Sequence, residues 1–183
     1  MAFGISWRPP TANALYTYAC SGQTFGKTIQ VKSLEGDRYA YAEKRDGIEA
    51  GEILVEKPRE WFLYSLFAKA GAADGTEKRI IPLNGPFSAV KAELGKERVV
   101  HYEVVSRLNA DNELWAARIK AEKVGQFASK YRGAQAGYLI TESHSSRDKK
   151  VDVRAFFTAG DIFPVFYSVR DSAAHLESCS LKK

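Results

Sequence analysis

Cysteine, methionine and histidine are scarce in this chain. The 183 residues include two cysteines, one methionine and three histidines. Cys20 and Cys179 are too few for a disulfide framework, and they lack the spacing of a metal-binding cluster. The sequence therefore predicts two reduced thiols in a cytoplasm and no cofactor, with a single bridge joining the two ends of the chain as the alternative.

Patterns that mark membrane insertion or export are also missing. No apolar run approaches the roughly 20 residues that a membrane-spanning helix needs. The first residues, MAFGISWRPPTANA, show no basic region followed by an apolar region, so no secretory signal is expected. These absences predict a soluble cytoplasmic protein with no membrane partner, or a virion protein if the chain is a structural subunit.

Aromatic residues, by contrast, are plentiful, with 10 Phe, 9 Tyr and 3 Trp. Such a composition favours strands and stacking surfaces over long helices. The length and the 45% content of hydrophobic residues suit one domain over residues 1–183, with an arm at 1–13 and a tail at 171–183. No internal repeat divides the chain.

Short alternating runs predict about nine strands. They are 15–20, 28–34, 39–44, 52–56, 99–108, 114–121, 137–143, 150–158 and 162–169. Two helices are predicted at 57–71 and 84–95, each with a proline near its start and a glycine at its end, and the tail reads as a last short helix. Pro164 suggests that the final strand lies at an edge or carries a bulge. The predicted class is α+β, mostly antiparallel sheet with helices inserted mid-chain.

The clearest hairpin is predicted between 99–108 and 114–121, turning at Asn109–Asn112. In the expected register Tyr102 faces Ile119, and Glu103 faces Arg118. This pairing leaves one apolar face and one charged face, as a half-buried antiparallel pair requires.

The segment CSGQTFGKTIQV contains Gly26-Lys27-Thr28. A phosphate-binding loop ends in the same three residue types. Gly22 stands one residue too close to Gly26 for that motif. The residues after Thr28 alternate as in a strand, so no helix N-terminus would face a phosphate. The sequence therefore favours a turn between two strands and not a nucleotide site.

The segment TESHSSRDKK places Glu142, His144 and Asp148 within seven residues. A catalytic triad is normally assembled from distant parts of a fold, so a polar loop between strands explains these residues as well. His101 and Glu103 share a strand face, but two ligands do not make a metal site. No catalytic or metal site is predicted, and an enzyme such as a nuclease or a nucleotide-dependent enzyme remains the weakest alternative.

The strongest functional signal runs from Leu114 to Gly133, where five basic residues stand against one acidic residue and Trp115, Phe127 and Tyr131 are interleaved. Basic groups that follow a phosphate backbone, beside aromatics that stack on bases, are typical of single-strand binding. The predicted nucleic-acid-binding residues are Arg118, Lys120, Lys123, Lys130, Tyr131 and Arg132. For this segment the alternative is a solvated face with core aromatics and no binding role. The second functional hypothesis is a structural subunit of an assembly such as a phage particle, with neighbouring subunits as partners.

Overall fold

The computed structural model describes residues 11–22, 25–33, 39–55, 78–83, 94–106, 112–158, 163–172 and 175–182. Every helix or strand in these ranges is a β-strand. None of the described residues belongs to a helix with the length and apolar character needed to cross a bilayer.

Eleven strands form one antiparallel sheet. In chain order they are β1 (Leu15–Gly22), β2 (Gly26–Ser33), β3 (Tyr39–Arg45), β4 (Ile48–Val55), β5 (Lys78–Pro82), β6 (Glu97–Ser106), β7 (Asn112–Ser129), β8 (Gly133–Ser146), β9 (Lys149–Thr158), β10 (Phe166–Asp171) and β11 (His175–Leu181). Their order across the sheet is β4-β3-β2-β1-β11-β10-β9-β8-β7-β6-β5. Every neighbouring pair is therefore consecutive in the chain except β1 and β11.

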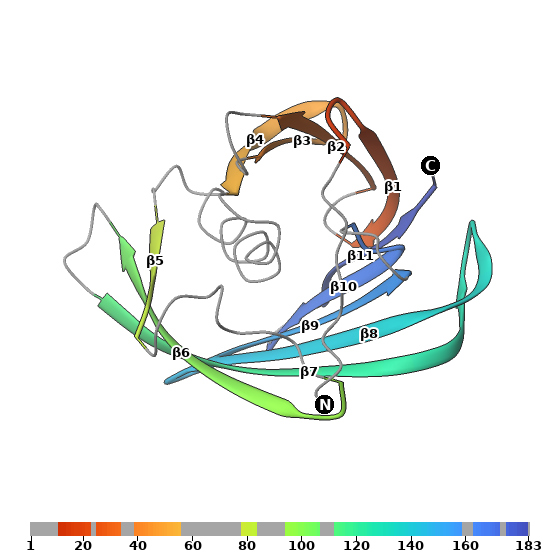
Figure 1. The fold of residues 1–183 in the computed structure, drawn as a ribbon. Coiled ribbons are helices and arrows are strands. Elements are labelled where there is room, and N and C mark those ends of the chain that lie inside the picture. Colours follow the sequence, from red (N-terminus) through yellow and green to blue (C-terminus); the bar gives the residue numbers. More distant parts are fainter. Residues whose placement is uncertain are drawn as a thin grey trace.

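The pairing of β1 with β11 joins two runs of consecutive strands, which we call the seam. The sheet is strongly curved, with β1–β4 on one side and β6–β9 on the other, and β10 and β11 connect them near the seam (Figure 1). Every neighbouring pair of strands is antiparallel, including β1 and β11. Since β4 is the fourth strand on one side of the seam and β5 is the seventh on the other side, these two edge strands run in the same direction. The two edges of the sheet therefore cannot pair as an antiparallel hairpin, although β4 and β5 are consecutive.

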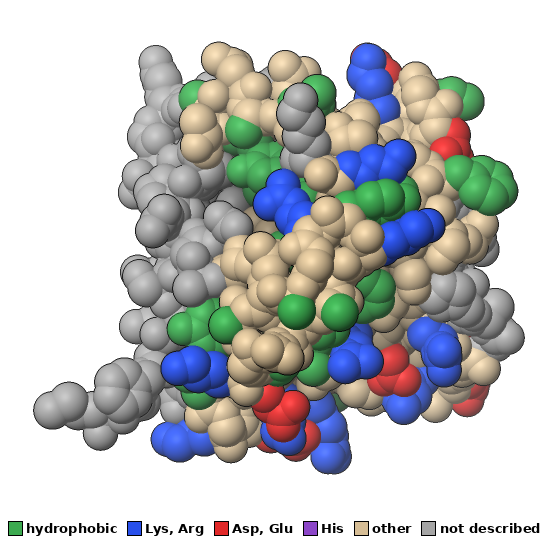
Figure 2. All heavy atoms as spheres, turned by 90° about the vertical axis from the view of Figure 1, so that its right-hand side faces the viewer, with side chains coloured by type: hydrophobic (Ala, Val, Ile, Leu, Met, Phe, Trp, Pro, Cys, Tyr) green, Lys and Arg blue, Asp and Glu red, His purple; other side chains and the backbone are tan. Residues whose placement is uncertain are grey.

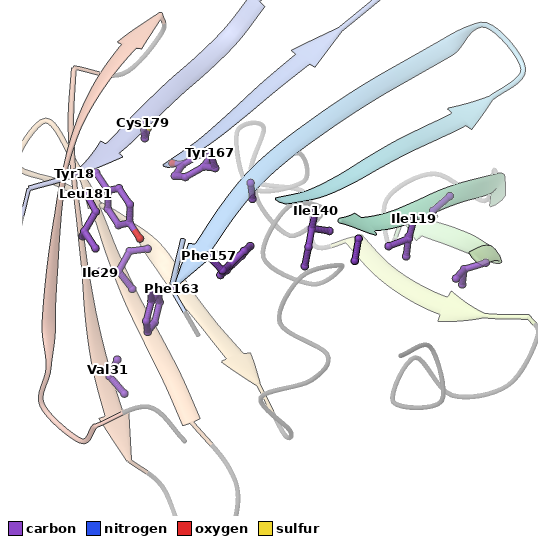
Figure 3. Close-up of a cluster of buried hydrophobic side chains, with 14 of the residues drawn as sticks. Tyr18, Ile29, Val31, Ile119, Ile140, Phe157, Phe163, Tyr167, Cys179 and Leu181 are labelled. Carbon is purple, nitrogen blue, oxygen red and sulfur yellow. The ribbon is translucent and has the colours of Figure 1, made fainter. Parts of the chain in front are cut away.

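The core lies on the concave side of this sheet. Strand side chains alternate between the two faces, and the buried set comes from one face of successive strands. Figure 3 shows Tyr18, Ile29, Ile140, Phe157 and Tyr167 projecting from their strands toward that side. Phe163, which precedes β10, adds a ring to the same cluster and contacts Tyr16 with 4.0 Å between ring centroids.

A smaller apolar cluster lies on the opposite face of the sheet, beside the part of β7 and β8 that extends past β9. Leu139, Phe156 and Val165 are buried there, and Phe127 stacks on Phe156 at 4.3 Å. Gly137 permits this packing, because a Cβ at that position would lie 2.0 Å from the carbonyl oxygen of Phe157.

The predicted α+β class is wrong, since the described residues form a single all-β sheet. The segments predicted as helices, 57–71 and 84–95, lie outside the described residues except for Leu94 and Gly95. The tail is not a helix but contains β11, a central strand whose backbone pairs with β1 and β10. Backbone pairing with a strand on each side outweighs the weak local preference of this segment for a helix.

The hairpin between β6 and β7 is confirmed, but its register is wrong by four residues. Tyr102 pairs with Trp115 and not with Ile119, while Glu103 pairs with Leu114. Arg118 lies opposite Val99 and contacts Glu97 at 3.6 Å. An even shift leaves every side chain on its expected face, so alternation alone cannot distinguish the two registers.

The other predicted strands match described strands within a few residues, whereas β5 was not predicted.

The strand after Pro164 is not at an edge. β10 begins at Phe166, after this proline, and lies between β9 and β11. Its irregularity falls at Val169 and Arg170, at the opposite end of the strand. The carbonyl oxygen of Pro164 instead accepts a hydrogen bond from Tyr18 Oη at 2.8 Å.

Candidate functional site

The six residues predicted to bind nucleic acid do not form one surface. Arg118 and Lys120 are exposed on the outer face of β7, and Lys123 lies farther along that strand, opposite Tyr138. Lys130, Tyr131 and Arg132 form the turn between β7 and β8. Figure 2 shows basic side chains spread over one side of the molecule, with hydrophobic and other side chains between them, and not a continuous basic band.

The aromatic residues of that segment are mostly engaged within the protein. Trp115 is buried and stacks against Tyr102 with ring centroids 6.3 Å apart, and Phe127 packs on Phe156. Tyr131 is exposed, and its ring is approached by the ammonium groups of Lys130 and Lys182 at 5.4 and 5.7 Å. The stacking platform expected for a single strand is therefore missing from this segment.

A hollow of about 550 Å³ lies on the outer face of the sheet, beside Arg118 and Lys120. Two rows of register partners build it. One row is Arg118, Ser143, Asp152 and Arg170, and the next is Lys120, Thr141, Arg154, Ser168 and Ser178. In the first row Ser143 and Asp152 are shorter than the arginines at its ends, and in the second row the short Thr141, Ser168 and Ser178 flank Arg154. We call this hollow the outer groove.

The acidic groups of the outer groove are already engaged. Partial burial opposes ionisation of Asp152, but a hydrogen bond from Ser143 Oγ at 2.7 Å and the nearby Lys150 ammonium hold its pKa below the ordinary value. Glu97 contacts Arg118 at 3.6 Å. Glu142 forms part of the wall, but its carboxylate binds His144 on the opposite face.

The cations of the outer groove differ in their partners. Lys120 Nζ lies 2.5 Å from Glu122 Oε1. The hydrogen bond to this carboxylate and its negative charge raise the pKa of Lys120. Arg154 and Arg170 are exposed and make no hydrogen bond or ion pair with the residues that the structure describes. Sequence reasoning missed both arginines, although the alternating runs KVDVRAFF and FYSVRD place them on one polar face with Asp152 and Ser168.

A disulfide joins the two strands of the seam. Cys20 on β1 and Cys179 on β11 are direct register partners, with Cα atoms 4.0 Å apart and a sequence separation of 159 residues. The predicted reduced thiols are therefore wrong, and the alternative of one bridge between the two ends of the chain is correct.

Lys27 lies next to the seam and is 1% exposed. Its ammonium group donates to Glu177 Oε1 at 2.7 Å and to the Tyr167 hydroxyl, and it lies 3.6 Å from Glu43. The Arg45 guanidinium binds Glu43 at 2.8 Å, so two cations balance two carboxylates. The prediction against a nucleotide loop agrees with this geometry, because Lys27 is on strand β2 and its charge is neutralised inside the protein.

Burial of Tyr167 beside these carboxylates raises its pKa well above the ordinary value. Burial is the largest cause, and the negative charges of Glu177 and Glu43 add to it. The Tyr167 hydroxyl donates to Glu177 Oε1 at 3.0 Å, so its proton is held within the cluster.

Glu142 and His144 meet, but not in a loop. Both lie on β8, two residues apart on its concave face, where His144 Nε2 is 2.9 Å from Glu142 Oε2. The Tyr102 hydroxyl is 3.2 Å from His144 Nδ1. Asp148 lies instead in the exposed β8–β9 turn. Since His144 is fully buried, this pair cannot reach a substrate and acts as a polar contact within the core.

The fold and these contacts define an all-antiparallel sheet whose seam carries a disulfide and whose outer face carries a polar groove. The chain matches no protein-family model and no curated protein sequence. Two solved structures share the fold over nearly the whole chain. One, from Parabacteroides distasonis, is provisionally described as a lipoprotein and has a TM-score of 0.54 at 11% identity, with 99% of each chain covered. The other, from Bacteroides fragilis, is provisionally described as an exported protein with a YmcC-like fold and has a TM-score of 0.53 at 12% identity, with 100% of this chain and 99% of that chain covered.

Two predictions are corrected at this point. The nucleic-acid-binding function is contradicted by the buried or capped aromatics and by neighbours described as a lipoprotein and an exported protein. The descriptions of these neighbours give no support to the phage-subunit and nuclease alternatives. The cytoplasmic location is contradicted by these descriptions together with the disulfide, because a reducing cytosol keeps most thiols free.

Proposed function

We propose that this chain is an extracytoplasmic binding protein in which the Cys20–Cys179 disulfide, formed after export, cross-links the two strands of the seam. The disulfide is the observation that carries this proposal, since such bonds form and persist in oxidising compartments. The descriptions of the two structural neighbours support it.

The distribution of polar groups favours binding over catalysis. A general acid or base must come within hydrogen-bond reach of its substrate. Three groups of the types suited to that role, Glu142, His144 and Glu177, are buried and engaged with one another or with Lys27. The outer groove is open and contains charged groups without protein partners among the described residues.

Fractionation of cells of the source organism, combined with thiol trapping, tests the location. Acid-quenched fractions are treated with a maleimide carrying polyethylene glycol, with and without prior reduction. We expect the protein outside the cytosolic fraction, with a gel shift only after reduction. A Cys20→Ser/Cys179→Ser variant controls for other reactive groups and should never shift. Recovery in the cytosol with both thiols free would overturn the proposal.

A further inference from the structure

The outer groove combines two arginines whose charges are not used by the described part of the protein. Arg154 and Ser168 are opposite each other on β9 and β10, and Arg170 is two residues beyond Ser168 on the same face of β10. Adjacent strands lie about 4.8 Å apart, and residues two apart in one strand lie roughly 7 Å apart. Both guanidinium groups can therefore reach the space above the Ser168 hydroxyl.

The groove has an excess of positive charge. Arg118, Lys120, Arg154 and Arg170 line it, whereas Glu97 and Asp152 are the acidic groups that face it. Asp152 is held by Ser143 and Lys150, and Glu97 lies beside Arg118. Neither carboxylate is within ion-pair distance of Arg154 or Arg170, so the excess of two charges remains at these arginines.

The lining also limits the kind of ligand. Thr141, Ser143, Ser168 and Ser178 offer hydroxyl groups, and no aromatic ring lines the groove in the described part of the chain. The neighbouring row on the same face, Leu139, Phe156 and Phe166, packs within the second apolar cluster and does not line the groove, so the described lining offers no aromatic surface on which a base could stack. Guanidinium forks bind oxyanions through paired N–H donors. A carboxylate has two oxygens and satisfies one fork, while a phosphate monoester has three terminal oxygens and about two negative charges at pH 7.

We propose that the outer groove binds the phosphate group of a small soluble phosphate monoester between Arg154 and Arg170, with the Ser168 hydroxyl as a further donor. The two forks match the terminal oxygens, and the dianion matches the excess charge. This inference goes beyond the proposed function and does not depend on the location of the protein, because it concerns the purified, oxidised chain.

Isothermal titration calorimetry with glucose 6-phosphate at low ionic strength tests the proposal. We expect saturable binding to the wild-type protein and none of glucose at the same concentrations. Arg154→Gln and Arg170→Gln should each weaken binding at least tenfold. Arg132→Gln removes an equal charge in the β7–β8 turn, outside the groove, and should change the affinity less than twofold.

Arg154→Lys separates a shaped site from general attraction to positive charge. Lysine keeps the charge but loses the fork, so we expect a loss of affinity close to that of Arg154→Gln. Circular dichroism of each variant shows whether the sheet is intact, and Arg170→Lys provides a second test if one variant fails to fold. The proposal is overturned if the wild type binds no phosphate monoester, or if Arg132→Gln weakens binding as much as Arg154→Gln. Binding to phosphatidylglycerol vesicles without binding to glucose 6-phosphate would also overturn it.

Discussion

Cys20 and Cys179 are direct register partners on neighbouring strands although 159 residues separate them in the chain. They lie in the one strand pair of the sheet that no local connection brings together. The disulfide therefore stabilises the strand pair whose formation closes the longest loop and so costs the most chain entropy. Lys27, which binds Glu177 of β11 from β2, reinforces the same place across β1.

Loss of the disulfide should reduce stability substantially. Replacing Cys20 and Cys179 with serine removes a constraint on a very long loop of the unfolded chain, and we expect the free energy of unfolding to fall by about 2–5 kcal/mol. Urea unfolding followed by circular dichroism measures this change. Dithiothreitol should destabilise the wild type similarly and leave the variant unaffected. Equal stability of the oxidised wild type and the variant would contradict the role of the bond.

Lys27→Ala should be among the most damaging single substitutions. It leaves the carboxylates of Glu43 and Glu177 buried without the ammonium group between them, and breaking a buried pair in this way costs about 3–5 kcal/mol. Lys44→Ala is the matched control, because Lys44 is exposed and lies 3.8 Å from Glu49. It should change the free energy of unfolding by less than about 1 kcal/mol. Similar losses for both variants in urea unfolding would show that the buried cluster contributes little.

Gly137→Ala tests the close approach of β8 to β9. The added methyl group would lie 2.0 Å from the Phe157 carbonyl oxygen and 2.8 Å from the Phe156 ring, so a strand must move. We expect a loss of about 1–3 kcal/mol, the range for overpacked sites, seen as a lower melting temperature. At Gly125 on β7 an added Cβ would have no atom within 4 Å, so Gly125→Ala should melt near the wild type. A wild-type melting temperature for Gly137→Ala would refute the steric argument.

Stability should decline at alkaline pH. Burial and the nearby carboxylates raise the pKa of Tyr167 in the folded state, whereas a tyrosine of the unfolded chain has a pKa of about 10. Above that pH the unfolded chain releases a proton that the folded protein keeps. Unfolding is then favoured by about 1.4 kcal/mol for each further pH unit per such tyrosine. Below pH 10 the contribution of Tyr167 is fully present.

Urea unfolding at pH 9, 10 and 11 measures this slope. Tyr167→Phe removes the titrating group and should flatten the decline, even though its starting stability is lower. Tyr131→Phe is the control, because Tyr131 is exposed in the β7–β8 turn. Should Tyr131→Phe flatten the decline as much as Tyr167→Phe, the buried hydroxyl is not its source.

The outer groove shows how far sequence reasoning could reach into the site. Arg118 and Lys120 were found because they fall in one basic segment, whereas Arg154 and Arg170 come from two different strands. Only the pairing of β9 with β10 places these arginines together. In the same way, Glu142 and His144 were noticed as neighbours in the chain, but their burial depends on β6 and the core around it.

Alternation in the sequence predicts most strand positions and the face on which each side chain lies. Both depend on a period of two residues, which is a local property of the chain. It did not determine the register of β6 and β7, because a shift of four residues preserves every face. The seam, the disulfide and the burial of Lys27 arise only when the strands assemble into the folded sheet. Each of these requires contacts between the first strands and the last ones, and no local pattern specifies which distant strands will meet.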